Sequence, residues 1–157
     1  MVFSSDDEAS LDKIDEDLRN AIEPTFGLFS KIIAGACTRI PILGRSENRL
    51  RIARLTEAGA WTDAAIALLK MEMPGWQIRR LGYENEEWLC SLSRQPNLPM
   101  ALDDCAEATH ETLPLAILCA FLEACRRSHM IQKSASAVPQ IQQPMAEHNM
   151  MCCDDFA

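Results

Sequence analysis

Residues 76–94 contain two β-prone runs on either side of residues 85–86, and this pattern predicts a β-hairpin. With residues 85–86 as a two-residue loop, Tyr83 would face Trp88 across the ladder. The first run breaks its alternation of apolar and polar side chains. A β-bulge near residues 79–80 would return the apolar side chains to one face.

A second turn conformation is possible at the tip of the hairpin. Glu84 would stand opposite Glu87 in the two-residue loop, and like charges in that position repel each other. A longer, open turn is therefore the alternative. In the second run the side chains of Trp88, Cys90 and Leu92 alternate with smaller or more polar ones, so one face of the hairpin is apolar.

Helical patterns flank the hairpin on both sides. One begins near Thr62 or Asp63 and ends at Pro74. Residues 105–110 alternate weakly and predict a short third strand. A second helix then opens at Pro114, and its apolar stripe is Leu115, Leu118, Cys119, Leu122 and Cys125. This α-β-β-β-α order predicts an α+β fold, a two-layer sandwich in which a three-stranded antiparallel sheet has its helices on one face.

The composition divides the chain into three parts. Residues 45–128 form the predicted α+β domain. Residues 1–44 are predicted to be a partly disordered acidic arm followed by an apolar helical segment, although Leu11, Ile14, Leu18 and Ile22 at helical spacing leave a partner-binding helix open. Residues 129–157 are rich in Ser, Gln, Met, Ala and Pro, and predict a disordered tail.

Residues 26–43 are the most apolar run outside the predicted domain. They are too short and too charged to span a bilayer, but an amphipathic segment with basic residues can lie on a membrane surface. The competing interpretations are packing on the chain's own domain or on a sister subunit. A small domain buries little of its surface alone, so a homodimer formed through this run is a hypothesis.

Charge and cysteine usage restrict the partners and the compartment. A net charge of −8 and a pI near 4.8 argue against general attraction to nucleic acid or to anionic membranes. The seven cysteines are odd in number, and no secretory signal precedes them. Reduced thiols and a cytoplasmic location are therefore expected.

The candidate chemical groups give no catalytic pattern. His148 lies near Cys152 and Cys153, but adjacent cysteines lack the spacing of a zinc site. Cys105 and His110 are predicted to face opposite sides of a strand, so they form no nucleophile–base pair. Phosphate-binding glycine motifs do not occur. The chain is therefore predicted to be no enzyme, and to use no metal and no cofactor.

A protein–protein interaction or accessory module is the predicted function. The predicted contact surface is the uncovered face of the hairpin and the segment after it, with Arg79, Arg80, Arg94, Gln95 and Asn97. An RNA-binding domain is one alternative, because double-stranded-RNA-binding domains share the helix–three strands–helix order. Membrane association through residues 26–43 is the other.

Four segments carry a resemblance to other proteins, and they are RLTEAGAWTDAA at 54–65, RRLGYE at 79–84, SLSRQPNLP at 91–99 and LPLAIL at 113–118. In these segments the chain resembles small alphaproteobacterial proteins without an assigned activity. Residues 63–127 are also similar to the phage-type ABA sandwich domain, in which a small sheet leads into a closing helix with a Pro-Leu-Ala-Ile start. Neither resemblance implies a reaction. The resemblance implies a Gly at the hairpin tip, where this chain has residues 85–86 without one.

Overall fold

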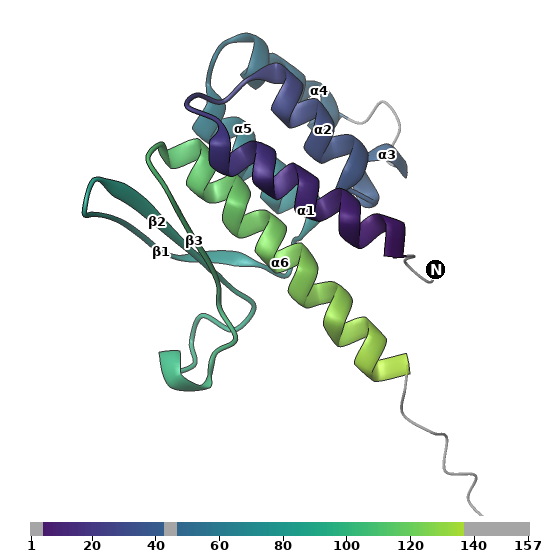
Figure 1. Ribbon diagram of the computed structural model, residues 1–157, viewed down its shortest axis with the longest axis vertical. Coiled ribbons are helices and arrows are strands. Elements are labelled where there is room, and N and C mark those ends of the chain that lie inside the picture. The colour runs from purple at the N-terminus through teal and green to yellow at the C-terminus, as the bar shows by residue number, and fades with distance from the viewer. Residues whose placement is uncertain (1–4, 43–46, 137–157) are drawn as a thin grey trace, which may run out of the picture.

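The computed structural model describes residues 5–42 and 47–136. Its helices are α1 (Ser5–Asn20), α2 (Phe26–Gly35), α3 (Arg39–Ile42), α4 (Glu47–Glu57), α5 (Trp61–Glu72) and α6 (Leu113–Ser136). Its strands are β1 (Gln77–Glu84), β2 (Glu87–Ser93) and β3 (Ala106–His110), with a short 3-10 helix η1 (Met100–Leu102) before β3. The predicted α+β fold, with a three-stranded antiparallel sheet, is confirmed (Figure 1).

The hairpin closes through the predicted two-residue loop. Asn85 and Glu86 have backbone φ angles of 54° and 67°, which is the left-handed conformation that both central residues of a type I′ turn need. Asn adopts this conformation readily, whereas Glu adopts it at a cost. Glu84 pairs with Glu87 at the end of the ladder, so their repulsion does not open the turn, and the turn forms without Gly.

The register of the sheet also follows the prediction. Tyr83 pairs with Trp88, and the register shifts between Ile78 and Arg80, where the bulge was expected. The third strand forms as well, because β3 pairs antiparallel with β2 and gives the order β1-β2-β3. The bulge returns Ile78 and Tyr83 to one face of β1, because Ile78 pairs with Leu92 and Tyr83 with Trp88.

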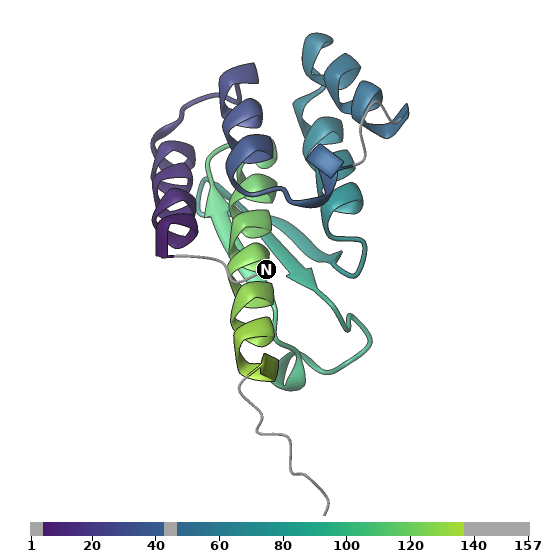
Figure 2. The ribbon, with the colours of Figure 1, turned by 90° about the vertical axis from the view of Figure 1, so that its right-hand side faces the viewer.

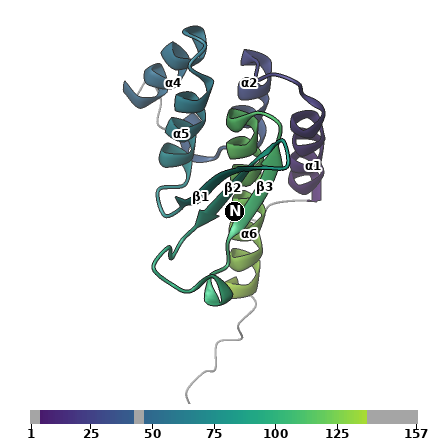
Figure 3. The same ribbon diagram turned by 90° about the vertical axis from the view of Figure 1, so that its left-hand side faces the viewer.

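Helix α6 is the centre of the core. From Leu115 to Cys125 every residue except Glu123 is buried, and a helix that is apolar on all sides needs partners on all sides. The strands β2 and β3 cover one side of α6, while α1 and α5 cover others. Figure 2 shows α6 between these helices, and Figure 3 shows the sheet lying in front of it.

Helix α1 belongs to the core, which corrects the prediction of a partly disordered acidic arm outside the domain. Leu11, Ile14 and Leu18 are buried at 2%, 6% and 0% exposure. Apolar burial of this size outweighs the dispersing effect of the acidic residues around it. Gly35 of α2 allows the close approach, because a Cβ at this position would lie 2.6 Å from the Ile14 Cδ1 atom.

The described part of the apolar run, residues 26–40, packs on its own domain. Phe29, Ile32 and Ile40 are at most 1% exposed, so these side chains are inside the fold instead of at a membrane surface. Phe26 is the exception at 61% exposure. Among the described residues, no helix has the length and apolar character needed to cross a bilayer.

Helix α6 also continues farther than expected. The prediction ended the domain at residue 128, but the helix runs to Ser136. The residues after the apolar stripe, including Met130 and Ile131, have no helix breaker before Pro139. Residues 137–157 of the predicted tail lie outside the described residues, as does the candidate metal cluster around His148.

Candidate binding cleft

Glu72, the last residue of α5, fixes the start of α3. Its carboxylate accepts hydrogen bonds from the backbone N–H groups of Thr38 (2.6 Å), Arg39 (2.9 and 3.0 Å) and Ile40 (3.1 Å), and from the Thr38 hydroxyl (3.1 Å). Glu72 is only 7% exposed, and these donors satisfy the buried charge. They also tie α3 to α5, which leaves the Arg39 side chain at the surface.

A cleft of about 690 Å³ opens where α3, the end of α5, the start of β1 and the second half of α6 meet. Trp76 lines it at 5% exposure, and its indole N–H donates to the Ser128 hydroxyl at 3.3 Å. Arg39 of α3, Arg94 directly after β2 and His129 of α6 line the same cleft. Three groups that carry or can carry positive charge therefore converge from separate elements.

A second hollow of about 620 Å³ adjoins this cleft and shares Arg39 and Pro74 with it. Arg51 of α4 and Lys70 of α5 line this second hollow. We call the four cationic side chains along the two hollows the basic track, which consists of Arg39, Arg51, Lys70 and Arg94. Because the basic track lines both hollows, it extends beyond either hollow alone.

The members of the basic track are exposed, and none forms a hydrogen bond or ion pair through its side chain with another residue in the described ranges. Two carboxylates lie close by. Glu72 is already saturated by four protein groups that donate to it, whereas Asp63 is an exposed member of the second hollow. The local charge along the track is therefore positive, although the whole chain is acidic.

Arg79, one of the predicted contact residues, is engaged inside the fold. Its guanidinium forms an ion pair with Asp103 and donates to the Leu98 carbonyl at 2.7 Å. The side chains of Arg79 and Asp103 are 16% and 3% exposed. The Ser93 hydroxyl also donates to Asp103, at 2.6 Å.

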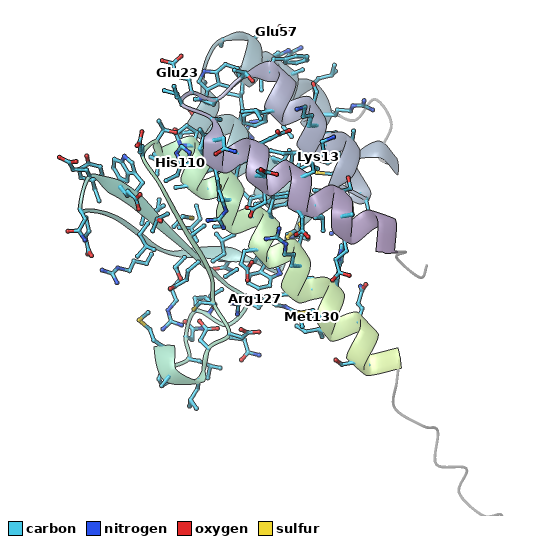
Figure 4. The ribbon with its side chains drawn as sticks, in the orientation of Figure 1. Lys13, Glu23, Glu57, His110, Arg127 and Met130 are labelled. Carbon is cyan, nitrogen blue, oxygen red and sulfur yellow. The ribbon has the colours of Figure 1, made fainter. Side chains whose placement is uncertain are left out.

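We call Arg79, Ser93, Asp103 and the Cys105 thiol, which donates to Asp103 at 3.2 Å, the sheet-end cluster. Next to it, Arg127 of α6 pairs with Asp104, and Figure 4 shows Arg127 pointing toward the loop between β2 and β3. The outer face of the sheet is therefore covered at this end, and Ser93 is fully buried.

The other predicted contact residues are divided between two places. Arg80 is exposed on β1 and donates to Glu84 at 2.9 Å. Gln95 and Asn97 have exposed side chains in the loop after β2, and the Gln95 backbone N–H donates to the Ser93 hydroxyl at 2.9 Å. Arg94 alone of the five predicted residues lines the cleft.

Sequence reasoning missed Arg39, Arg51 and Lys70 as site residues. The one available signal was that Arg39 interrupts an apolar run and Lys70 follows a buried helical stripe. A charged residue in such a sequence position is expected to face solvent, and nothing more follows from the pattern. Which other charges it faces depends on how α3, α4 and α5 pack, and no local pattern contains that information.

The cysteines of the described residues do not form a nucleophilic site. Burial raises the pKa of the Cys90 and Cys125 thiols to about 12 and that of Cys119 to about 11, so these groups are protonated at neutral pH. His110 accepts a hydrogen bond from the Thr112 backbone N–H at 3.1 Å through Nδ1. This hydrogen bond fixes the turn between β3 and α6, where Figure 4 labels His110, whereas the Cys105 thiol donates to Asp103.

Neither a metal site nor a similar protein indicates the function. Within residues 5–42 and 47–136, no group of three or more His, Cys, Asp and Glu side chains is placed to hold a metal ion. No protein-family model, curated protein or solved structure matches the chain. The function is therefore argued from the geometry of the cleft.

Proposed function

We propose that the protein is a non-catalytic binding module of the cytoplasm, and that its basic track holds an extended acidic segment of a partner protein. One observation supports this most. Four cationic side chains, from α3, α4, α5 and the residue directly after β2, line two adjoining hollows, and none has a side-chain partner among residues 5–42 and 47–136. Cations without partners in the described part of the chain are available to a partner protein.

The residue types suit carboxylates. The guanidinium groups of Arg39, Arg51 and Arg94 can each form two parallel hydrogen bonds with one carboxylate, and Lys70 adds a point charge. A single small anion would contact one hollow, whereas an extended chain with repeated Asp or Glu can contact both. Electrostatic complementarity of this kind sets specificity and the association rate.

The net charge of −8 does not oppose this proposal, because the acidic residues are concentrated elsewhere. Residues 5–20 contain seven acidic and two basic side chains, a net of −5, whereas residues 39–70 contain six basic and three acidic ones, a net of +3. At physiological ionic strength charges are screened over about 8 Å. A bound segment therefore experiences mainly the charges of the track.

Nucleic acid fits the track less well. Single-stranded nucleic acid is bound on exposed aromatic side chains, and Trp76, the aromatic residue of the cleft, is only 5% exposed. Duplex RNA requires basic groups near the start of the second helix of the domain. Here α6 begins with Leu113 and Pro114 after Glu111, and it has no basic residue in its first turn.

Fluorescence anisotropy with a labelled oligoglutamate peptide tests the proposal. The wild-type protein should bind the peptide, and added salt should weaken binding. The Arg39→Ala/Arg94→Ala double variant should raise the Kd at least tenfold, which corresponds to about 1.4 kcal/mol. The matched control is Lys13→Ala/Arg80→Ala, which removes two exposed cations outside the track and should leave the Kd unchanged.

Two results would overturn the proposal. The first is an equal loss of peptide binding in the control, which would show that only net charge matters. The second is a wild-type protein that binds no peptide. An RNA oligonucleotide that binds more tightly than the peptide, with the same dependence on Arg39 and Arg94, would replace the acidic partner with the nucleic-acid alternative.

A further inference from the structure

Strand β1 is an edge of the sheet, and the edge that faces away from β2 pairs with no strand among residues 5–42 and 47–136. The two-residue turn makes Glu84 and Glu87 a hydrogen-bonded pair. Such pairs alternate along an antiparallel ladder with pairs that are not hydrogen-bonded. Leu81 and Tyr83 belong to pairs without hydrogen bonds, so their backbone N–H and C=O groups point to the open edge. Figure 3 shows β1 at the outer side of the sheet.

The side chains of Leu81 and Tyr83 lie exposed on the apolar face of the sheet. They pair with Cys90 and Trp88, and Cys90 is fully buried, whereas Leu81 is 41% and Tyr83 is 58% exposed. The apolar face therefore continues onto β1, while α6 packs on β2 and β3. An open strand edge that carries exposed apolar side chains is a place where another strand can pair.

Gly82 lies between these two residues, and the fold of one copy does not require a glycine there. Its φ angle is outside the left-handed region. A Cβ at this position would meet only the Arg80 Nε atom within 4 Å, at 4.0 Å, which is an ordinary contact. Glycine weakens a strand, and it often marks a place where another backbone approaches closely. A second strand on the open edge accounts for this glycine.

We infer that β1 pairs with β1 of a second copy of the chain, antiparallel and with Gly82 opposite Gly82 on a two-fold axis. In this register Leu81 of each copy stands opposite Tyr83 of the other. Both are hydrogen-bonded pairs, which use the N–H and C=O groups of the open edge. On the apolar face the same pairs bring Leu81 and Tyr83 side chains into contact. The two sheets become one continuous sheet.

The charges on the other face of β1 agree with this register. Arg80 of each copy stands opposite Glu84 of the other, while the two Glu84 residues are about 14 Å apart along the strands. Arg80 and Glu84 of one copy already form an ion pair at 2.9 Å. This pair does not need to break, because the inverted pair of the second copy lies beside it with opposite charges adjacent. Glu87, which pairs with Glu84 in the hairpin, adds a negative charge near Arg80 of the second copy.

Strand β1 is therefore complementary to itself in its backbone groups, its apolar side chains and its charges. A two-fold axis gives each of these contacts twice, because the same patch of both copies is used. Only residues 80–84 pair, so the interface is small and the dimer is in equilibrium with the monomer. None of these residues lines either hollow of the basic track, so the dimer and peptide binding can be tested separately.

Sedimentation velocity over a range of protein concentrations tests the dimer. The wild-type protein should show a monomer–dimer equilibrium, and Leu81→Lys should raise the dimer Kd at least tenfold, because a charge on an edge strand opposes pairing. The matched control is Leu50→Lys, which makes the same change at a leucine of α4 with 49% exposure. It should leave the dimer Kd unchanged. Circular dichroism should show the wild-type spectrum for both variants.

Disulfide trapping tests the register, in a background with Cys152 and Cys153 replaced by Ser. Gly82→Cys should form an intermolecular disulfide on mild oxidation, because the Cα atoms of a pair without hydrogen bonds are about 4.5 Å apart, within the range of a disulfide. Glu84→Cys is the matched control, because its two copies would be about 14 Å apart. On non-reducing gels Gly82→Cys should crosslink at least tenfold faster than Glu84→Cys and than the background protein.

Three results would overturn the inference. The first is a wild-type protein that is a monomer at every concentration, which would leave the open edge to an extended segment of another protein. The second is a dimer that Leu81→Lys weakens no more than Leu50→Lys does. The third is crosslinking of Glu84→Cys at the rate of Gly82→Cys, which would exclude the register with Gly82 on the axis.

Discussion

The sheet-end cluster and the basic track both contain arginine, but the arginines of the two regions differ in their surroundings. At the sheet end, Arg79 is paired with Asp103 and with the Leu98 carbonyl, and both charged side chains are largely buried. Along the track, Arg39 and Arg94 are exposed and unpaired within the described residues. One region uses its charges to hold a loop, and the other leaves its charges for a partner.

The difference teaches that the environment of an arginine determines its role. Arg79 lies in β1 and Arg94 directly follows β2, and both were expected to contribute to one contact surface. The loop between β2 and β3 brings Asp103 to Arg79, while no carboxylate of the described chain pairs with Arg94. Removing Arg79 should therefore affect stability, and removing Arg94 should affect binding.

The largest loss of stability is expected on substitution of Glu72. Its carboxylate accepts several hydrogen bonds from the protein, as that of Asp103 does, but Glu72 lines the cleft. Glu72→Ala leaves the N–H groups of Thr38, Arg39 and Ile40 without their acceptor, so it should lower the free energy of unfolding by about 3–5 kcal/mol. Urea denaturation measures this change. The control Glu16→Ala removes an exposed glutamate of α1 and should stay within about 0.5 kcal/mol of wild type. Equal stability of the two variants would contradict the role of Glu72.

The second prediction compares the two arginines directly. Arg79→Ala should lower the free energy of unfolding by about 1.5–3 kcal/mol, because hydrogen bonds to charged groups are lost in a buried place. Arg94→Ala should change it by less than about 0.5 kcal/mol. Urea denaturation of both variants, with peptide anisotropy on the same samples, gives the comparison. Peptide binding should fall in Arg94→Ala and persist in Arg79→Ala, and the reverse pattern would refute the division of roles.

The third prediction uses pH to probe the sheet-end cluster. The Ser93 hydroxyl, followed by Cys105 and Arg79, lowers the pKa of Asp103 below its ordinary value and outweighs the opposing effect of burial. An unfolded Asp titrates near pH 3.9, so the unfolded chain binds more protons just below this value. Stability from Asp103 is therefore present above about pH 4 and is lost as the pH falls through the folded pKa.

Urea midpoints measured from neutral pH down to acid check this expectation. In the wild-type protein the urea concentration at the midpoint should decrease once the pH is below about 4. In Asp103→Asn this midpoint should be lower at neutral pH and should depend less on pH. Some acid dependence should remain in the variant, because Lys31 also lowers the pKa of Asp17. Identical slopes for the two proteins would show that Asp103 makes no contribution.

The smallest expected effect is a change in the reactivity of the Cys105 thiol. Burial, followed by the hydrogen bond to Asp103, raises the pKa of its thiol, so less thiolate is present at pH 8 than in a free cysteine. Iodoacetamide should modify Cys105 several-fold more slowly in the native protein than in urea, as measured by peptide mass spectrometry. A native rate as high as the unfolded rate would show that the cluster does not enclose the thiol.

Most of the α+β domain could be predicted from local patterns. The hairpin register, the bulge near Arg80 and the turn at Asn85 depend on neighbouring residues and on the two-residue period of a strand. The placement of α1 could not be predicted, because its acidic residues indicate an exposed segment while Leu11 and Leu18 show only that one side is apolar. The contact with α6 that buries them is far away in the sequence.

The candidate site shows the same limit. Arg94 was selected because it follows the hairpin, but Arg39, Arg51 and Lys70 join it only through the packing of α3, α4 and α5. The sequence by itself determined the strands, the turn and the apolar helix at the centre, because these depend on periodicity and on local backbone preferences. The tertiary structure alone decided which charges are paired and which remain exposed, because pairing depends on distances between residues that are far apart in the chain.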